Sequence, residues 1–485
     1  MTNESSSPLL AQVRQLATDA RAAVPSLANE YDTLLTRIDQ PLRVAIVGKV
    51  KAGKSTLLNA LLGEELAASD AGECTRIVTW YQHGEQYLVT AEAGSESSPV
   101  PFTHQDGRLD IDLEGRDHND VNRLLIEAPA DELRSMSLID TPGMASLSND
   151  ISAKSSDFLT PDDGSDTPVD AVIYLLRHLQ ATDVSFLRAF RDSEFITPSP
   201  VNCLAVLSRA DEVASGRLDA IESAQRIATR YSADVRLRRL VQSVVPVAGL
   251  VGRASASITA TDVAHVQSIA DLEPARAQLL LLSVDRFLDD TSLAMTAEER
   301  EHLLDLLGLF GLRLLEAHLR ESPTDLAGVR TLLRNKSGIG HLQAMLHTLF
   351  GGRRDTLKAR SALVAIQRLL DEVEHPREIS AEVERIWASA HEFSELRALN
   401  TLRESNMGLS DEQRQDAERI LGGQGADIPS RLGWPDAQPH SDEATALLET
   451  ISRWRQIGEN PIAPRSVKTI CDVVIRSCEG LYAQR

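Results

Sequence analysis

A glycine-rich run between two apolar segments constrains the fold of this chain more than any other feature. Residues 48–55 read Gly-Lys-Val-Lys-Ala-Gly-Lys-Ser. Residues 42–47, which precede them, are mostly apolar and rich in β-branched side chains, as is typical of a buried parallel strand. Residues 56–63, which follow, have the apolar spacing of a helix that ends at a glycine. A strand, a glycine loop and a helix in this order predict a phosphate-binding loop.

The residue types in this loop suit an anionic ligand. Glycines let backbone N–H groups curl around a phosphate, and the N-terminus of the new helix faces it. We expect the side chain of Lys54 to reach the β- and γ-phosphates and the hydroxyl of Ser55 to bind Mg²⁺. The alternative is an ordinary strand–turn–helix corner. The predicted nucleotide-binding residues here are Gly48, Lys49, Val50, Lys51, Ala52, Gly53, Lys54, Ser55 and Thr56.

A second motif, Asp-Thr-Pro-Gly at residues 140–143, follows a predicted strand. We expect Asp140 to hold a water on Mg²⁺ and the N–H of Gly143 to bond the γ-phosphate, a contact that hydrolysis would break. Since these residue types also favour turns, the alternative is a plain turn. Between the two motifs, Thr75 could ligate Mg²⁺ and contact the γ-phosphate, although many threonines precede strands without such a role.

Base recognition is predicted from the run Ser208-Arg209-Ala210-Asp211, which follows another predicted strand. Asp211 could accept hydrogen bonds from guanine N1–H and the 2-amino group, whereas adenine presents an acceptor at N1. Arg209 would lie against the base. The N–H of Ala248, after the next predicted strand, could meet guanine O6. The alternative for residues 208–211 is an acidic loop. In this order the motifs predict a domain that binds GTP and GDP with Mg²⁺.

Composition and charge limit the number of domains, the binding partners and the cellular compartment that we expect for this chain. A chain of 485 residues is too long for a single core. Its net charge of −21 argues against nucleic acid and against anionic membranes as a general partner. The four cysteines lack the spacing of metal ligands and favour a reducing cytosol. The N-terminus does not read as a signal peptide. The longest apolar stretch, residues 303–315, is shorter than the ~20 residues that a membrane span needs and predicts a buried helix.

Alternating strand and helix patterns from residue 41 to about residue 251 predict an α/β fold, a doubly wound and mostly parallel sheet. The expected strands are residues 44–47, 77–82, 87–92, 136–139, 171–176, 202–207 and 243–247. Residues 93–119 predict an insertion or hairpin, and residues 160–167 an exposed loop. Further helices are expected at residues 9–38, 272–288, 297–318, 326–335, 339–374 with a break or hinge at Gly351-Gly352, 381–401, 411–421, 442–455 and 466–483.

At these motifs the sequence resembles the dynamin superfamily of large GTPases, and within it the isoniazid-inducible dynamin-like proteins of actinobacteria. The stretches that carry the resemblance are residues 42–62, 75–80, 140–143, 208–212 and 281–287. The resemblance implies a helix at residues 1–40 in a neck, a GTPase head at 41–255, and an all-helical neck and trunk bundle at 256–485. It also implies GTP hydrolysis coupled to self-association through the head and to membrane remodelling, in a cytoplasmic protein peripherally bound to the inner membrane face.

Two departures from the family pattern bear on mechanism. Dynamins usually carry Gln-Ser, or a close variant, where this chain has Val50-Lys51. In that family the serine helps to hold a monovalent cation and the glutamine helps to order the attacking water. The ammonium of Lys51 could take the place of that cation, or Lys51 could be a solvated loop residue. Met144 stands where small GTPases often have a catalytic glutamine, which dynamins also lack. The residues expected to act in hydrolysis are Lys51, Lys54, Thr75 and Gly143.

Three functions compete. The first is a GTP hydrolase that dimerises through its head and acts on membranes. The second is a regulatory partner with low activity that assembles with a paralogous dynamin-like protein. The third, a ribosome-associated GTPase, is disfavoured by the charge. Membrane contact could lie near residues 375–379 or Ile386-Trp387, although Trp387 is more typical of a core. The basic runs 353–354 and 236–239 are of the kind that usually faces solvent.

Overall fold

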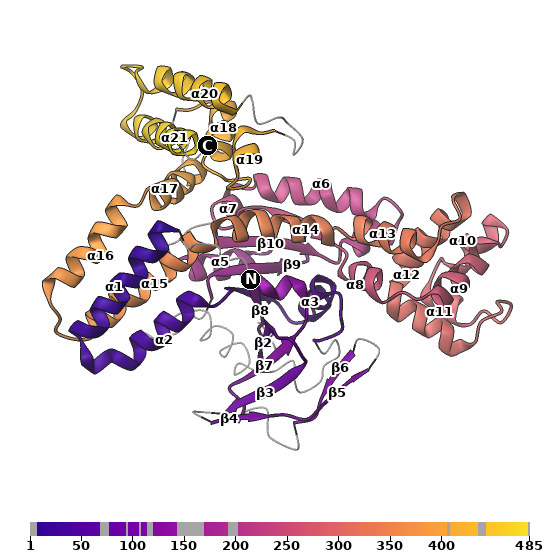
Figure 1. Cartoon of the computed structure of the whole chain (residues 1–485). Helices are drawn as coiled ribbons and strands as arrows, with labels where there is room; N and C mark the ends of the chain where they lie inside the picture. The colour runs from indigo at the N-terminus through magenta and orange to yellow at the C-terminus, as the bar shows by residue number, and fades with distance from the viewer. Residues whose placement is uncertain are drawn as a thin grey trace.

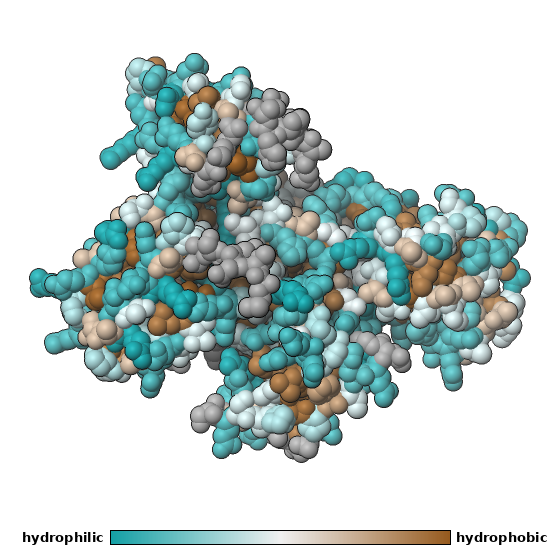
Figure 2. Space-filling model, viewed as in Figure 1, coloured by the Kyte–Doolittle hydropathy of each residue, from teal (hydrophilic) through white to brown (hydrophobic). Residues whose placement is uncertain are grey.

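The computed structural model describes residues 7–67, 77–93, 96–105, 108–113, 120–142, 169–192, 202–404, 408–434 and 443–483. A mostly parallel α/β sheet forms the centre of the molecule, and helical groups project from it on three sides (Figure 1). On the face shown in Figure 2, hydrophilic residues cover most of the surface, as the net charge of −21 leads one to expect.

The described part of the sheet contains nine strands in the order β11-β10-β9-β1-β8-β2-β7-β3-β4. Their bounds are β1 Leu42–Gly48, β2 Val78–His83, β3 Leu88–Ala93, β4 Glu96–Pro99, β7 Arg123–Ala128, β8 Met136–Asp140, β9 Ala171–Leu176, β10 Cys203–Ser208 and β11 Val244–Val247. Strands β1, β8, β9, β10 and β11 run parallel, while β2 is antiparallel to β8 and β3 is antiparallel to both β7 and β4. A separate hairpin joins β5 Phe102–Gln105 to β6 Arg108–Ile111.

All seven predicted strands are confirmed, each within two residues of its predicted ends. The β5–β6 hairpin confirms the insertion that we expected in residues 93–119. Strand β7 was missed, although its residues alternate between buried and half-buried positions as a strand should. The loop expected at residues 160–167 lies outside the described residues.

The helices occupy most of the remaining chain. Those of the first half are α1 Pro8–Ala23, α2 Ala28–Asp39, α3 Lys54–Leu62, α5 Ala181–Asp192, α6 Ala220–Ala233 and α7 Val235–Arg238. Those of the middle are α8 Gly249–Ser257, α9 Ala260–Ala270, α10 Pro274–Leu280, α11 Val284–Leu288, α12 Ala297–Glu321, α13 Leu326–Ser337 and α14 Ile339–Met345. Those of the last part are α15 Arg354–Asp371, α16 Arg377–Ser389, α17 His391–Glu404, α18 Asp411–Ile420, α19 Ile428–Leu432, α20 Glu443–Gly458 and α21 Arg465–Ala483.

Several predicted long helices are wrong as single elements. Residues 9–38 form a pair of packed helices, α1 and α2, because Pro25 cannot continue a helical hydrogen-bond ladder. Residues 272–288 divide into α10 and α11, where the hydroxyl of Ser283 caps the second helix. Residues 381–401 divide into α16 and α17 at Ala390. The predicted break at Gly351-Gly352 is confirmed, since a short 3₁₀ segment there separates the helical run after α14 from α15.

Alternate residues of β1 face two different cores. Ala45 and Val47 join a cluster that includes α6, α8, α9, α12 and α13. Val44 and Ile46 join a cluster that includes α3, α14 and the β2–β7 part of the sheet. The period of two in a strand therefore divides one apolar run between the two faces of the sheet. A third cluster combines α1 and α2 with α15–α18, α20 and α21, and it contains the buried thiols of Cys471 and Cys478.

The apolar stretch at residues 303–315 lies in α12, where Leu303, Phe310 and Leu315 are buried, as predicted. Gly308, with φ 64°, interrupts the regular helix inside this stretch. Within the described ranges, none of the helices combines the length and the apolar character that crossing a membrane requires.

The two basic runs that we expected to face solvent are only partly exposed: Arg236 and Arg239 are exposed as predicted, whereas Arg238 and Arg353 are not. Arg353 is buried and donates a 2.8 Å hydrogen bond to the carbonyl of Leu421, so the expectation of a solvent-facing pair at residues 353–354 is wrong for it. Burial lowers the pKa of Arg353 to about 10. Arg238 is half-buried and bonds the carbonyl of Leu402 at 2.9 Å. Trp387 is half-buried with its ring 4.7 Å from that of Phe393, which agrees with a core interpretation.

The third cluster should set the stability of the helices that it joins, which are α1, α2, α15–α18, α20 and α21. Leu363, in α15, is fully buried in it. We expect Leu363→Ala to lower the free energy of unfolding by about 2–5 kcal/mol, because the cavity closes only in part. Urea unfolding followed by circular dichroism measures the effect. Leu448→Ala, at a half-exposed position of α20, is the matched control and should change it by less than about 0.5 kcal/mol.

Candidate nucleotide-binding site

The phosphate loop joins the end of β1 to the start of α3, and glycine is required at two of its positions. A Cβ on Gly48 would lie 3.0 Å from both Cβ and the carbonyl oxygen of Leu175, so a side chain there would push the loop off β9. Gly53 has φ 92°, a conformation that other residues rarely adopt. The N–H of Ala52 closes the turn by donating to the carbonyl of Lys49 at 3.0 Å. The loop is thus shaped by its backbone, as a phosphate cradle requires.

The structure brings Lys54, Ser55 and Asp140 together at the start of α3. The hydroxyl of Ser55 donates to Asp140 Oδ2 at 3.1 Å, and Lys54 Nζ lies 3.5 Å from the carbonyl of Gly48. Burial lowers the pKa of Lys54, an effect that the Asp140 carboxylate partly offsets. Burial raises the pKa of Asp140, against the effects of Lys54 and Ser55. A phosphate would add negative charge beside the Lys54 ammonium to that of Asp140.

The same residues fit Mg²⁺. Asp140 Oδ1 is buried and has no hydrogen-bond partner among the described residues, while Oδ2 is bonded to Ser55. A hydroxyl and a carboxylate oxygen with a free lone pair are hard oxygen ligands of the type that Mg²⁺ takes directly or through water. The next residue, Thr141, donates its hydroxyl to the carbonyl of Ile46 at 2.9 Å, which ties the end of β8 to β1. Thr75, Gly143 and Met144 lie outside the described residues.

The side chain of Lys49 points along a different direction from that of Lys54. Its Nζ donates to Gln180 and Thr182 at 2.7 and 2.8 Å and pairs with the Asp183 carboxylate at 2.9 Å. Asp183 is buried and also accepts the hydroxyl of Tyr174 at 2.9 Å. Lys49 therefore fastens the loop to the start of α5. Sequence reasoning missed this contact, because 131 residues or more separate the partners and no motif links them.

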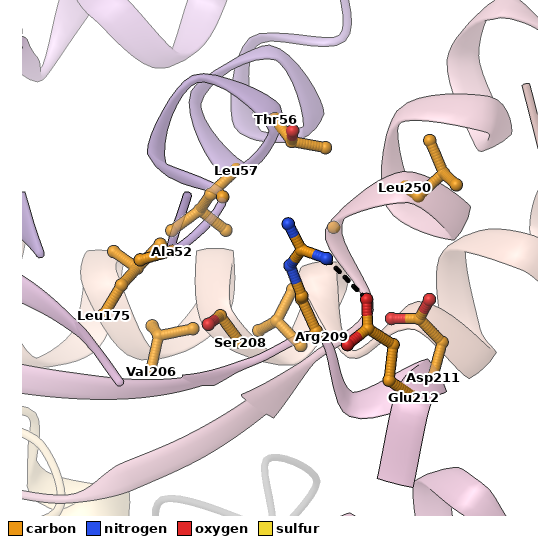
Figure 3. A pocket seen from close by; sticks show the side chains of 13 residues that line it. Ala52, Thr56, Leu57, Leu175, Val206, Ser208, Arg209, Asp211, Glu212 and Leu250 are labelled. Atoms are coloured by element: carbon orange, nitrogen blue, oxygen red, sulfur yellow. Dashed lines mark hydrogen bonds and ion pairs between the residues drawn. The ribbon is translucent and has the colours of Figure 1, made fainter. Parts of the chain in front are cut away.

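The predicted base-recognition residues border a pocket with a volume of about 230 Å³ beside the phosphate loop (Figure 3). Ser208 is buried and its hydroxyl donates to the carbonyl of Leu176 at 3.3 Å. Asp211 is half-buried, and burial raises its pKa. The lining residues are Ala52, Gly53, Thr56, Leu57, Leu175, Val206, Ser208, Arg209, Asp211, Glu212, Val247, Gly249 and Leu250.

Arg209 connects this pocket with the phosphate loop. Its guanidinium donates to Glu212 Oε1 at 2.6 Å, the contact drawn in Figure 3, and to the carbonyl of Lys51 at 3.2 Å. Lys51 is exposed and has φ 61°, while Val50 is also exposed. The sequence did not point to Glu212 as a partner of Arg209. The hydrogen bond from Arg209 to the carbonyl of Lys51 thus connects the predicted base-recognition residues with the predicted phosphate loop at one edge of the sheet.

Ala248 has a different partner from the one we expected. Its N–H donates to the carbonyl of Ser337 at 2.9 Å, and the residue is fully buried. The pocket is lined instead by Gly249 and Leu250, the first residues of α8. The structure thus corrects the expected O6 contact from Ala248, because that donor is already used.

A glycine loop between a buried parallel strand and a helix, with a hydroxyl and a carboxylate at the helix start, defines a protein of the P-loop nucleotide-binding class. A model of the dynamin family matches residues 44–164. The isoniazid-induced protein IniC of Mycobacterium tuberculosis is 36% identical over 460 residues, which cover 94% of this chain and 92% of that protein. A bacterial dynamin-like protein of Nostoc punctiforme is 29% identical over 114 residues, covering 21% of this chain and 16% of that one.

Among solved structures, one described as an oligomerised bacterial dynamin pair covers 98% of this chain and 75% of that chain. At 13% identity and a TM-score of 0.30, this likeness is too weak to bear on the arrangement of the parts. The identity to IniC extends over nearly the whole of both sequences. The chain therefore belongs to the dynamin family of GTPases and, within it, to the family of IniC. Membership confirms the resemblance seen in the sequence and implies binding of a guanine nucleotide.

The position of Asp211 predicts a change of base preference. We expect Asp211→Asn to weaken GTP binding by at least about 10²-fold, because an amide cannot accept both guanine N–H groups. The same variant should gain affinity for xanthosine triphosphate, whose C2 carbonyl accepts the amide N–H. Fluorescence titration with both nucleotides measures the exchange. Glu222→Gln, at an exposed position of α6, should keep the preference for guanine; unchanged GTP binding by Asp211→Asn would exclude this role.

Proposed function

We propose that this chain is a dynamin-like GTP hydrolase that binds GTP and GDP with Mg²⁺ at the site described above. The observation that carries the proposal is the grouping of Lys54, Ser55 and Asp140 at the end of the phosphate loop, with one carboxylate oxygen left for a Mg²⁺-bound water. The base pocket that contains Asp211 lies directly beside this group. Membership in a GTPase family supports the same assignment.

In this proposal each residue has one task. The ammonium of Lys54 stabilises the charge that develops on the β- and γ-phosphates. This electrostatic attraction is stronger in a site of low polarity than in water. Ser55, Asp140 and Thr75 hold Mg²⁺, which offsets the remaining phosphate charge. The N–H of Gly143 contacts the γ-phosphate, so the segment that follows responds to its loss. Arg209 and Asp211 hold the base, and Arg209 ties it to the carbonyl of Lys51.

The expected division of the chain stays a prediction. It assigns residues 1–40 to the neck, residues 41–255 to the GTPase head, and residues 256–485 to the helical neck and trunk. The third hydrophobic cluster supports a neck, since it joins α1 and α2 to α15 and α16.

We further propose that heads associate and that assembly stimulates hydrolysis, with membrane remodelling as the outcome at the inner membrane face. A regulatory partner with low activity, acting with a paralogue, is the second candidate. It is favoured by Val50, an exposed apolar residue where dynamins carry a water-ordering glutamine.

Assembly-stimulated hydrolysis predicts a specific dependence on concentration. We expect GTP turnover per chain to rise with protein concentration, because this sequence carries methionine at position 144 and a second head must complete the site. Lys54→Ala should abolish turnover at every concentration, whereas Lys468→Ala, a charge-matched control in α21, should not. Phosphate release, measured with and without anionic liposomes, provides the test. Tight GTP binding with negligible turnover throughout would favour the regulatory partner instead.

Lys51 predicts the response to monovalent cations. Its exposed position on the loop leaves the ammonium able to take the place of a cation near the transferred phosphate. An arginine finger supplies a rate factor of about 10³–10⁵ by comparable electrostatics. We therefore expect hydrolysis that does not depend on K⁺ or Na⁺, and a fall of at least about 10-fold in Lys51→Ser. Turnover is measured in K⁺, Na⁺ and choline buffers; a strong K⁺ requirement of the wild type would contradict the prediction.

A further inference from the structure

The chain segment that leads from β11 to the base pocket packs against a turn far away in the sequence. Strand β11 is the edge strand of the sheet, and the chain after it leads through Ala248 to the start of α8 at the pocket. The turn between α13 and α14, residues Ser337 and Gly338, lies against this segment. The carbonyl of Ser337 accepts the N–H of Ala248 at 2.9 Å. One backbone hydrogen bond thus joins two segments that are 89 residues apart (337 − 248).

Glycine is the only residue that permits this approach. Gly338 has φ 78°, and a Cβ at this position would lie 2.4 Å from the carbonyl oxygen of Pro246 in β11. No real Cβ comes so close to backbone, so any side chain would displace the strand end. The hydroxyl of Ser337 fixes the turn, since it donates to the carbonyl of Arg334 at 2.8 Å and accepts the N–H of Ile339 at 3.3 Å.

The bond to Ser337 orients the amide that follows Ala248. Ala248 is the N-cap of α8 and Gly249 is its first residue, whose N–H has no partner within the helix. Gly249 lines the pocket next to α3, where a Cβ on Gly249 would lie 3.5 Å from Cγ2 of Thr56. Since the N–H of Ala248 is used, the N–H of Gly249 is the next donor available to a base in this pocket.

We propose that the Ser337-Gly338 turn is a positioning element of the guanine site: it holds Ala248 so that the N–H of Gly249 is presented to guanine O6. The proposal rests on the GTP binding proposed above and assigns a part of it to residues outside every nucleotide-binding motif of the sequence. Ser337 and Gly338 act through Ala248 and Gly249 and do not touch the nucleotide.

The test compares GTP with 6-thio-GTP, which keeps N1–H and the 2-amino group but replaces O6 with a poor acceptor. Both nucleotides offer Asp211 the same N–H donors, and the larger sulfur affects wild type and variants alike. The change in the ratio of dissociation constants from wild type to variant therefore reports the O6 contact. Titrations use the full chain at neutral pH. The wild type should prefer GTP by about 3- to 10-fold, the range that one net hydrogen bond supplies.

Three glycine-to-alanine variants grade the disturbance of the turn. In Gly338→Ala the new Cβ meets Pro246 O at 2.4 Å, and the preference for GTP should fall below about twofold. In Gly252→Ala, on α8, the new Cβ lies 3.3 Å from Ala60 Cβ and at contact distances of 3.4 and 3.5 Å from Ile339 Cβ and Ser337 Cβ. It requires a shift of a few tenths of an ångström between α8 and its neighbours, so an intermediate ratio is expected. Gly340→Ala, whose nearest neighbour is the flexible Arg334 side chain at 3.7 Å, is the matched control and should keep the wild-type ratio.

Each outcome decides one question. A loss of fold would lower the affinity for both nucleotides equally and leave the ratio unchanged, and Gly252→Ala provides the reading if Gly338→Ala does not fold. A wild-type ratio together with wild-type affinity for GTP, in both Gly338→Ala and Gly252→Ala, would overturn the positioning role, as would equal binding of GTP and 6-thio-GTP by the wild type. Failure of the proposed function is seen separately, as an absence of GTP binding by the wild type or equal binding by Lys54→Ala.

Discussion

The parallel pairing of β1 with β8 and β9 is the constraint on which the rest of the site depends. The register sets Ile46 opposite Asp140 and Gly48 opposite Leu175, so three carboxyl ends meet at one edge of the sheet. Ligands of doubly wound sheets bind at this edge, because the loops after the strands open there. Gly48 approaches Leu175 so closely that a side chain would separate the two strands. The phosphate loop is therefore a consequence of sheet geometry as much as of its own sequence.

Most of the features that we predicted correctly from the sequence depend on local patterns of residues. The apolar strands, the glycine loop and the order of the motifs are encoded in short windows, where periodicity and residue type leave few alternatives. The missed breaks in helices have local causes too. Pro25 and Ser283 carry stop and start signals that helical periodicity outweighed in our interpretation. Strand β7 was overlooked because its six residues include Arg123 and Glu127, which weaken an apolar pattern.

The remaining contacts of the site could not be predicted, because the residues that form each contact are far apart in the chain. Nothing in residues 48–55 indicates that Lys49 pairs with Asp183. Likewise, the residues around Ala248 do not indicate that its N–H donates to the carbonyl of Ser337. Arg353 looked like a surface residue since charged pairs usually face water, yet it is buried against the carbonyl of Leu421. A lone arginine or glycine has no sequence signature for such a role, and only the tertiary arrangement assigns it.

The helices that follow the sheet are joined to it by contacts of two kinds. The α13–α14 turn meets β11 through backbone atoms at the base pocket, and α14 continues through the break at Gly351-Gly352 into α15 of the third cluster. Near the other end of β11, polar contacts dominate, since Arg403 bonds the carbonyls of Val241 and Gln242. Arg403 is buried, so breaking these bonds would leave polar groups without partners away from water, at a cost of about 1–3 kcal/mol per group. The short 3₁₀ segment at residues 351–353 connects these two regions. A Cβ on Gly351 would meet nothing within 4 Å among the described residues, whereas Arg353, two residues later, is buried and bonds the carbonyl of Leu421, so the segment is anchored at its C-terminal end.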